Sequence, residues 1–145
     1  MASFSRHVTV NWAGPLKEGK GEATAGTGAF RLPVTFLQRV GEPVGMTSPE
    51  ELIAAAHASC YAMALNATVG RKGGAIAQTH VTATITAEFN QGIKIQSSRL
   101  DVVAEGLTGI PAESFAEVAK EAEGGCPVSN ALRGSLTIEV NATVK

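Results

Sequence analysis

The sequence predicts an α+β fold with antiparallel β-sheet, because strand patterns and helix patterns occur in separate groups along the chain. Alternating polar and apolar residues open the chain and recur after one long apolar helix, and shorter helical patterns precede a closing strand. A chain of 145 residues can bury a sizeable core, so we expect a single domain over residues 1–145.

The composition is that of an ordinary soluble globular protein and argues against two classes of partner. A net charge of −1 gives no reason to expect binding to nucleic acid or to an anionic membrane, and 5% aromatic residues argue against base-stacking platforms. The first residues lack the basic stretch followed by an apolar one that a signal peptide has. We therefore expect a cytosolic protein, in which two cysteines are reactive or metal-bound rather than bridged.

Three strands are predicted ahead of the long helix. Residues 5–11 alternate, and residues 22–27 can return as a second strand that glycine weakens. Residues 33–40 predict the third strand, which places Arg39 near its end on the face opposite Val34. Glycine and proline directly after residue 40 are expected to end it.

The helix that begins at Pro49 is the element around which the chain is organised. Ser48 is a good N-cap residue, Pro49 suits the first helical position, and Glu51 can complete a capping box with Ser48. From there to residue 65 almost every side chain is apolar, and a helix that is apolar nearly all round is expected to be buried. We expect this run to be too short and too interrupted to span a bilayer.

The rest of the chain predicts a long hairpin, two helices and a closing strand, over residues 80–89, 93–104, 115–123, 126–133 and 135–144. The connection between the hairpin strands is short and contains Gly92. Gly124 ends the first helix, and Pro127 suits the first position of the second.

The two cysteines carry the chemistry, and four interpretations of them compete. Cys60, in the middle of the long helix, can be a small buried filler. His57 and Cys60 lie three residues apart on one helical face, so that they and Cys126 can be metal ligands. Cys60 can also be a nucleophile with His57 as its base, although amides within a helix are poor oxyanion donors. The fourth interpretation is thiol redox chemistry, in which Cys126 resolves an oxidised Cys60 as a disulfide.

The redox interpretation makes two demands on the fold. The Cα atoms of Cys60 and Cys126 must come within about 4.4–6.8 Å of each other for a disulfide to form. A cysteine in mid-helix gains little from the helix dipole, so another group must lower its pKa. A guanidinium keeps its charge when it is desolvated, and Arg39 is the best placed of the arginines.

Two motifs far apart in the chain resemble those of the OsmC/Ohr family of bacterial peroxidases. They are PEELIAAAHASC at residues 49–60 and GCPVS at residues 125–129. The NWAG and GKG segments at residues 11–14 and 19–21 extend the likeness over nearly the whole chain. The HASC motif at residues 57–60 and an arginine at position 39 resemble the OsmC branch of the family.

The resemblance implies a cysteine-based peroxidase that reduces organic hydroperoxides in preference to hydrogen peroxide. It implies an OsmC-like fold, an intertwined homodimer with two antiparallel sheets around paired central helices. Cys60 is then the peroxidatic thiolate, Cys126 the resolving thiol, and Arg39 and Glu50 an activating pair. The family needs no bound cofactor and takes its electrons from an external dithiol, typically lipoyl groups on proteins.

The position of Glu50 can be tested by helix geometry. Glu50 and Cys60 are ten residues apart, which is about 15 Å along one continuous helix. We therefore expect that the Glu50 near a given Cys60 comes from the partner subunit, with the central helices antiparallel across a two-fold axis. The alternative function is a dimeric protein that binds a small ligand or senses redox state without turnover.

Overall fold

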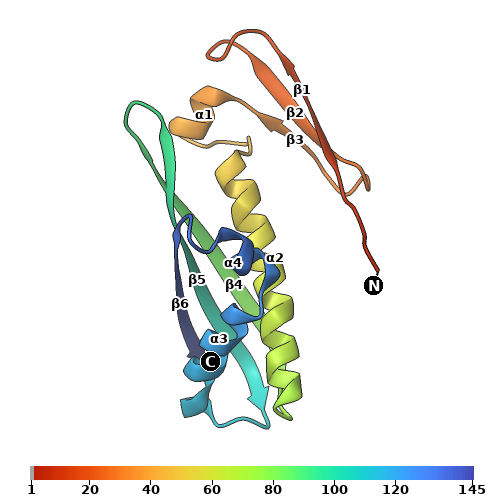
Figure 1. Ribbon diagram of the computed structural model, residues 1–145, viewed down its shortest axis with the longest axis vertical. Helices are drawn as coiled ribbons and strands as arrows, with labels where there is room; N and C mark the ends of the chain where they lie inside the picture. The colour runs from red at the N-terminus through yellow and green to blue at the C-terminus, as the bar shows by residue number, and fades with distance from the viewer. Residues whose placement is uncertain (1) are drawn as a thin grey trace. The chain divides into compact units, whose positions relative to one another are not determined.

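The computed structural model describes residues 2–145, which form two compact units (Figure 1). The first unit ends at Leu52, and the second runs from Ile53 to Lys145. The long helix, α2 (Pro49–Arg71), begins in the first unit and continues into the second.

The first unit contains an antiparallel sheet in the order β1-β2-β3, formed by β1 (Val8–Ala13), β2 (Lys20–Ala25) and β3 (Arg31–Val34). Trp12 on β1 pairs with Gly21 on β2. A Cβ atom at Gly21 would lie only 2.7 Å from the Trp12 ring, so the absence of a side chain lets the indole pack against the backbone. The first two predicted strands are present, with bounds shifted by two or three residues.

The third strand is shorter than predicted, because a helix replaces its second half. β3 ends at Val34, and α1 (Phe36–Val40) follows. Thr35 caps α1, its Oγ1 accepting a hydrogen bond from the backbone N–H of Gln38 at 3.3 Å. The prediction that Arg39 lies on a strand is therefore wrong, since this residue belongs to the last turn of α1.

The start of α2 confirms the predicted first residue and the predicted cap by Ser48. Pro49 is its first residue, and the Ser48 hydroxyl accepts a hydrogen bond from the Glu51 backbone N–H at 3.1 Å. Glu50 and Glu51 lie in the first turn, where negative charge complements the helix dipole.

The second unit packs helices on one face of a second sheet in the order β4-β5-β6 (Figure 1). The sheet consists of β4 (Ala75–Phe89), β5 (Ile93–Thr108) and β6 (Thr137–Val144), and the helical segments after β5 are η1 (Ala112–Ser114), α3 (Phe115–Gly124) and α4 (Pro127–Leu132). The core lies between the sheet, α2 and α3, and includes Tyr61, Leu65, Leu100 and Phe115. The predicted hairpin, helices and closing strand are all present.

One strand pairing differs from the prediction of antiparallel sheet. β4 and β5 are antiparallel, but β5 and β6 run parallel. The reason is the connection, since the chain leaves β5, passes through η1, α3 and α4, and returns to the end of the sheet from which β5 started. A helical crossover of this kind places the next strand in the same direction as the first.

Only one side of α2 is buried within the chain. Its buried stripe repeats every four residues, at His57, Tyr61, Leu65 and Val69, and packs into the core of the second unit. On another side Ala56, Ser59, Met63 and Ala67 are exposed, and Met63 exposes 71% of its surface. The expectation of burial all round is therefore met on one side only.

The length of α2 also corrects an expectation. Its 23 residues are long and apolar enough, by length and composition, to cross a membrane, so the run is not too short. The apolar window that meets this criterion is 28% buried, and the buried stripe of α2 packs into the core of the second unit.

Candidate active site

The second unit brings the two cysteines together. Cys126 is fully buried in the core, and Cys60 is half-buried and packs against the same core cluster. Both are free thiols, and Cys126 lies close enough to raise the pKa of the Cys60 thiol. Two cysteines separated by 66 positions in the sequence (126 − 60) are thus near each other in the second unit.

The surroundings of Cys60 within this unit do not favour a thiolate. Burial is the largest influence and raises the pKa of the Cys60 thiol, and Cys126 raises it further. A hydrogen bond from the Val128 backbone N–H lowers the pKa in part. The net shift of the Cys60 pKa is upward, so the surroundings within the second unit disfavour the thiolate.

Cys126 is fixed by the turn that connects α3 to α4. It is the N-cap residue of α4, and its Sγ accepts a hydrogen bond from the Ser129 backbone N–H at 3.5 Å. Pro127 occupies the first helical position, as predicted. The outer side of the turn is held by Arg133, whose guanidinium donates two hydrogen bonds to the Glu123 carboxylate at 2.9 and 2.7 Å.

His57 is fully buried and has a hydrogen-bond partner on each ring nitrogen. Nδ1 lies 2.6 Å from the Ser98 Oγ, and Nε2 lies 2.7 Å from the Ser129 Oγ. Burial lowers the pKa of His57, while the Glu123 carboxylate opposes this shift. Because both ring nitrogens of His57 are hydrogen-bonded to serine hydroxyls, His57 is not placed to act as a base for Cys60. This geometry argues against the interpretation of Cys60 as a nucleophile with His57 as its base.

The metal interpretation also lacks a ligand set. Among residues 2–145, no group of three or more histidine, cysteine, aspartate and glutamate side chains is arranged to hold a metal ion. Sequence reasoning identified His57 as a candidate ligand and missed both of its actual partners. Ser129 belongs to the second cysteine motif, but no sequence pattern connects it or Ser98 to His57.

Arg39 and Glu50 form an ion pair within the first unit. Nε of Arg39 lies 2.9 Å from Oε1 of Glu50, and Nη2 lies 2.7 Å from Oε2. The Glu50 side chain is 15% exposed and that of Arg39 28%, so the pair is largely shielded. The hydrogen bonds raise the pKa of Arg39 and lower that of Glu50, and both groups therefore stay ionised.

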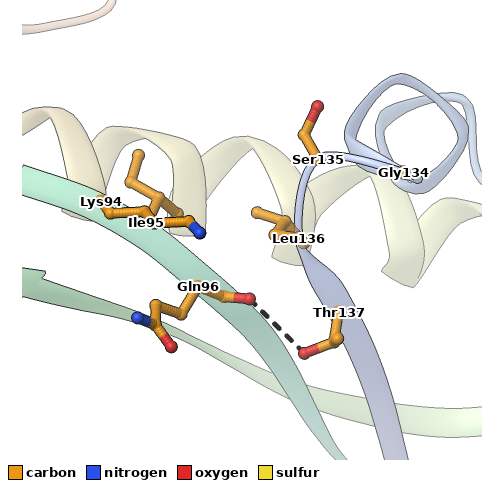
Figure 2. Close-up of a pocket in the computed structure, with 7 residues that line it drawn as sticks. All are labelled: Lys94, Ile95, Gln96, Gly134, Ser135, Leu136 and Thr137. Carbon is orange, nitrogen blue, oxygen red and sulfur yellow. Dashed lines mark hydrogen bonds between the residues drawn. The ribbon is translucent and has the colours of Figure 1, made fainter.

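A separate open pocket of about 400 Å³ lies between the start of β5 and the segment that leads into β6 (Figure 2). It is lined by Lys94, Ile95, Gln96, Gly134, Ser135, Leu136 and Thr137. The Thr137 hydroxyl donates a long hydrogen bond of 3.5 Å to the Gln96 carbonyl at its edge. None of the predicted site residues lines this pocket.

Comparison with known proteins agrees with the motifs and the fold. Residues 42–141 match the family described as OsmC-like protein. The peroxiredoxin OsmC of Escherichia coli strain K12 is 34% identical over 132 residues, which cover 90% of this chain and 91% of that protein. The organic hydroperoxide resistance protein OhrA of Bacillus subtilis is 36% identical over 99 residues, covering 65% of this chain and 67% of that protein.

The fold has counterparts among solved structures. An organic hydroperoxide resistance protein OsmC from Legionella pneumophila superposes with a TM-score of 0.75 and 21% identity over 99% of both chains, a likeness that concerns the fold alone. The sequence match extends over more than half of the residues. The chain therefore belongs to the OsmC/Ohr family of OsmC-like proteins.

Proposed function

We propose that the protein is a thiol peroxidase that reduces organic hydroperoxides to alcohols, with Cys60 as the attacking thiolate and Cys126 as the resolving thiol. The observation that carries the proposal is the pair of free, interacting thiols in one core cluster. Similarity to a peroxiredoxin and to organic hydroperoxide resistance proteins supports the same chemistry and substrate class.

The reaction proceeds in two steps within the protein. The Cys60 thiolate attacks the terminal oxygen of the hydroperoxide, the S–O bond forms as the O–O bond breaks, and the leaving alkoxide takes up a proton to become the alcohol. Cys60 is then a sulfenic acid. The Cys126 sulfur attacks the Cys60 sulfur, the disulfide forms, and the hydroxyl group leaves as water with the proton that Cys126 gives up.

Activation of Cys60 requires a positive charge, because its own unit raises the pKa of this thiol. Arg39 is the proposed source. It stabilises the thiolate and polarises the peroxide, while Glu50 holds the guanidinium in orientation through their two short hydrogen bonds. A guanidinium fits this role since it remains charged in shielded surroundings.

The Arg39–Glu50 pair acts on the Cys60 of the partner subunit in this proposal. Glu50 and Cys60 are ten residues apart on one continuous helix, which is about 15 Å. The side of α2 that carries Ala56, Met63 and Ala67 is exposed in the single chain, and small residues on it let a second helix approach closely. An antiparallel pairing of two α2 helices buries this side and brings the first turn of one helix towards the middle of the other.

The disulfide is reduced by an external dithiol, for which protein-bound lipoyl groups are the proposed source. The dithiol attacks one sulfur of the disulfide and closes to a disulfide itself, so that two electrons pass to the protein and both cysteines return to thiols. We also propose a cytosolic location, where free thiols persist.

The decisive experiment measures consumption of an alkyl hydroperoxide in the presence of a dithiol. The native protein should turn over, and the Cys60→Ser variant should not. The Cys126→Ser variant should undergo one oxidation and then stall or overoxidise. A binding or sensing protein would give at most one oxidation per chain even in its native form, and undiminished activity in both variants would contradict the mechanism.

A further inference from the structure

A buried polar triad connects the three elements that surround the two thiols. His57 on α2, Ser98 on β5 and Ser129 on α4 are all fully buried. The imidazole bridges the two hydroxyls at 2.6 and 2.7 Å. Every polar atom of the ring is satisfied, so the triad avoids the penalty of an unpaired buried polar group.

The proposed peroxidase mechanism makes no use of this triad. The triad nevertheless includes residues close in sequence to both cysteines. His57 is three residues before Cys60 on the same helix, and Ser129 is three residues after Cys126. The backbone N–H of Ser129 donates to the Cys126 sulfur at 3.5 Å. Ser129 is therefore hydrogen-bonded to His57 through its side chain and to the sulfur of Cys126 through its backbone.

Local hydrogen bonds join the turn that carries Cys126 to the end of α3, among them one from the Asn130 amide to the Gly124 carbonyl at 3.1 Å. α4 has only six residues, and an isolated helix of that length has no stability of its own. On its outer side the turn is held by the pair between Arg133 and Glu123, which is half-exposed at the arginine. On its inner side the bond between His57 and Ser129 joins it to α2 within the core.

We propose that His57 is a positioning residue for disulfide formation, which holds the first turn of α4 against α2 through Ser129 so that Cys126 faces Cys60. This inference rests on the proposed function for its place in turnover. Closure of the disulfide is itself sensitive to geometry, because the S–S bond forms only within narrow limits of Cα separation and torsion. A displacement of about 1 Å at a reacting centre can slow a step about a hundredfold.

Disulfide closure can be measured without any peroxide by using dithiobis(nitrobenzoate). The Cys60 thiolate attacks this aromatic disulfide and releases one coloured thiolate, which leaves Cys60 in a mixed disulfide. The Cys126 thiolate then attacks the Cys60 sulfur and expels a second coloured thiolate as the Cys60–Cys126 bond forms. The rate of the first phase depends on reagent concentration, and the rate of the second does not. The Cys126→Ser variant can release only the first coloured thiolate, so comparison with it identifies the second phase.

The test compares His57→Gln, Ser129→Ala and the double variant with the native chain. We expect each single change to slow the second phase about ten- to a hundredfold, and more than it slows the first phase. Because both changes remove the same hydrogen bond, the double variant should be no slower than the slower single variant. Ser97→Ala on β5, next to Ser98 but on the other face of the strand, is the matched control and should leave both phases unchanged.

The reduction potential of the disulfide gives a readout that a general loss of stability would not move. Looser placement of Cys126 lowers the equilibrium constant for closure, and a tenfold decrease corresponds to a potential about 30 mV less negative. Ser129→Ala removes a single hydroxyl and keeps a good helix former, so it carries the test on its own if His57→Gln does not fold.

Three results would overturn the inference: a second phase at the native rate in Ser129→Ala, equal slowing of both phases, or effects that multiply in the double variant. Failure of the native chain to consume hydroperoxides would instead contradict the proposed function. The second-phase rates would still decide whether His57 positions Cys126.

Discussion

The assignment of Arg39 as the activator of Cys60 predicts a specific defect when its charge is removed. In the single chain burial raises the pKa of Cys60, so the thiolate fraction at neutral pH depends on a cation from elsewhere. A neighbouring opposite charge lowers the pKa of an acidic group by about one to three units. Arg39→Gln should therefore reduce the rate at which Cys60 reacts at pH 7 about ten- to a thousandfold.

Two assays separate the two roles proposed for Arg39. Alkylation by iodoacetamide reports only the thiolate fraction, so in Arg39→Gln its rate should be low at pH 7 and recover as the pH rises. The hydroperoxide reaction should recover less, because the variant also lacks the group that polarises the peroxide. Arg31→Gln is the matched control, since it removes another arginine–glutamate pair of the same unit, with Glu22 at 2.6 Å.

A hybrid dimer tests whether the pair acts across the subunit interface. An Arg39→Gln subunit co-expressed with a Cys60→Ser subunit places an intact Cys60 opposite an intact Arg39–Glu50 pair at one of the two sites. Such a dimer should regain about half of the native activity, because one site of a two-fold assembly is complete. If the pair acted within its own subunit, no site would be complete. A hybrid no more active than the Arg39→Gln homodimer, or an unchanged alkylation profile, would refute the reasoning.

Three further predictions concern stability. Burial holds the pKa of His57 below its unfolded value of about 6.5, so the unfolded chain binds more protons just below that pH, and the free energy of unfolding should fall as the pH drops; denaturant titrations of His57→Gln should lack this component of the slope. Tyr61→Phe removes a buried hydrogen bond of 2.7 Å from the phenol to the Ala119 carbonyl, which keeps its helical partner, and should lower the free energy of unfolding by about 1 kcal/mol in urea titrations. Gly21→Ala places a methyl group 2.7 Å from the ring of Trp12 and should destabilise the first unit by about 1–3 kcal/mol, as followed by the fluorescence of this single tryptophan. These predictions would be contradicted by a native pH dependence of the unfolding free energy in His57→Gln, by an unchanged urea midpoint in Tyr61→Phe, or by an unchanged fluorescence transition in Gly21→Ala.

Local features such as the helix cap were predicted correctly where residues close in sequence determine the structure. Ser48 and Glu51 lie three residues apart, and their capping contact is present as the sequence indicated. The third strand failed for a local reason as well, because Val34 and Phe36 alternate like a strand while Thr35 caps a five-residue helix. Over so short a stretch the two periodicities cannot be distinguished.

Contacts between distant residues were predicted only where chemistry required them. Two cysteines suggested a redox pair whatever their separation in sequence, and the structure brings them together. The bonds from His57 to Ser98 and Ser129 span 41 and 72 residues, and serine hydroxyls carry no comparable signal. The parallel pairing of β5 and β6 was missed because strand direction depends on the crossover and not on the strand's own residues.

The two units divide the proposed chemistry between them. The second unit brings the thiols together and buries Cys126, and the partial burial of Cys60 raises the pKa of its thiol. The first unit holds an arginine that Glu50 orients and keeps in its charged form. A guanidinium paired in this way keeps N–H donors free for a thiolate and a peroxide, because its carboxylate partner uses only two nitrogens. Dimerisation through the exposed side of α2 would then complete the site, which makes peroxidase activity a property of the assembled pair, whereas disulfide closure belongs to each chain alone.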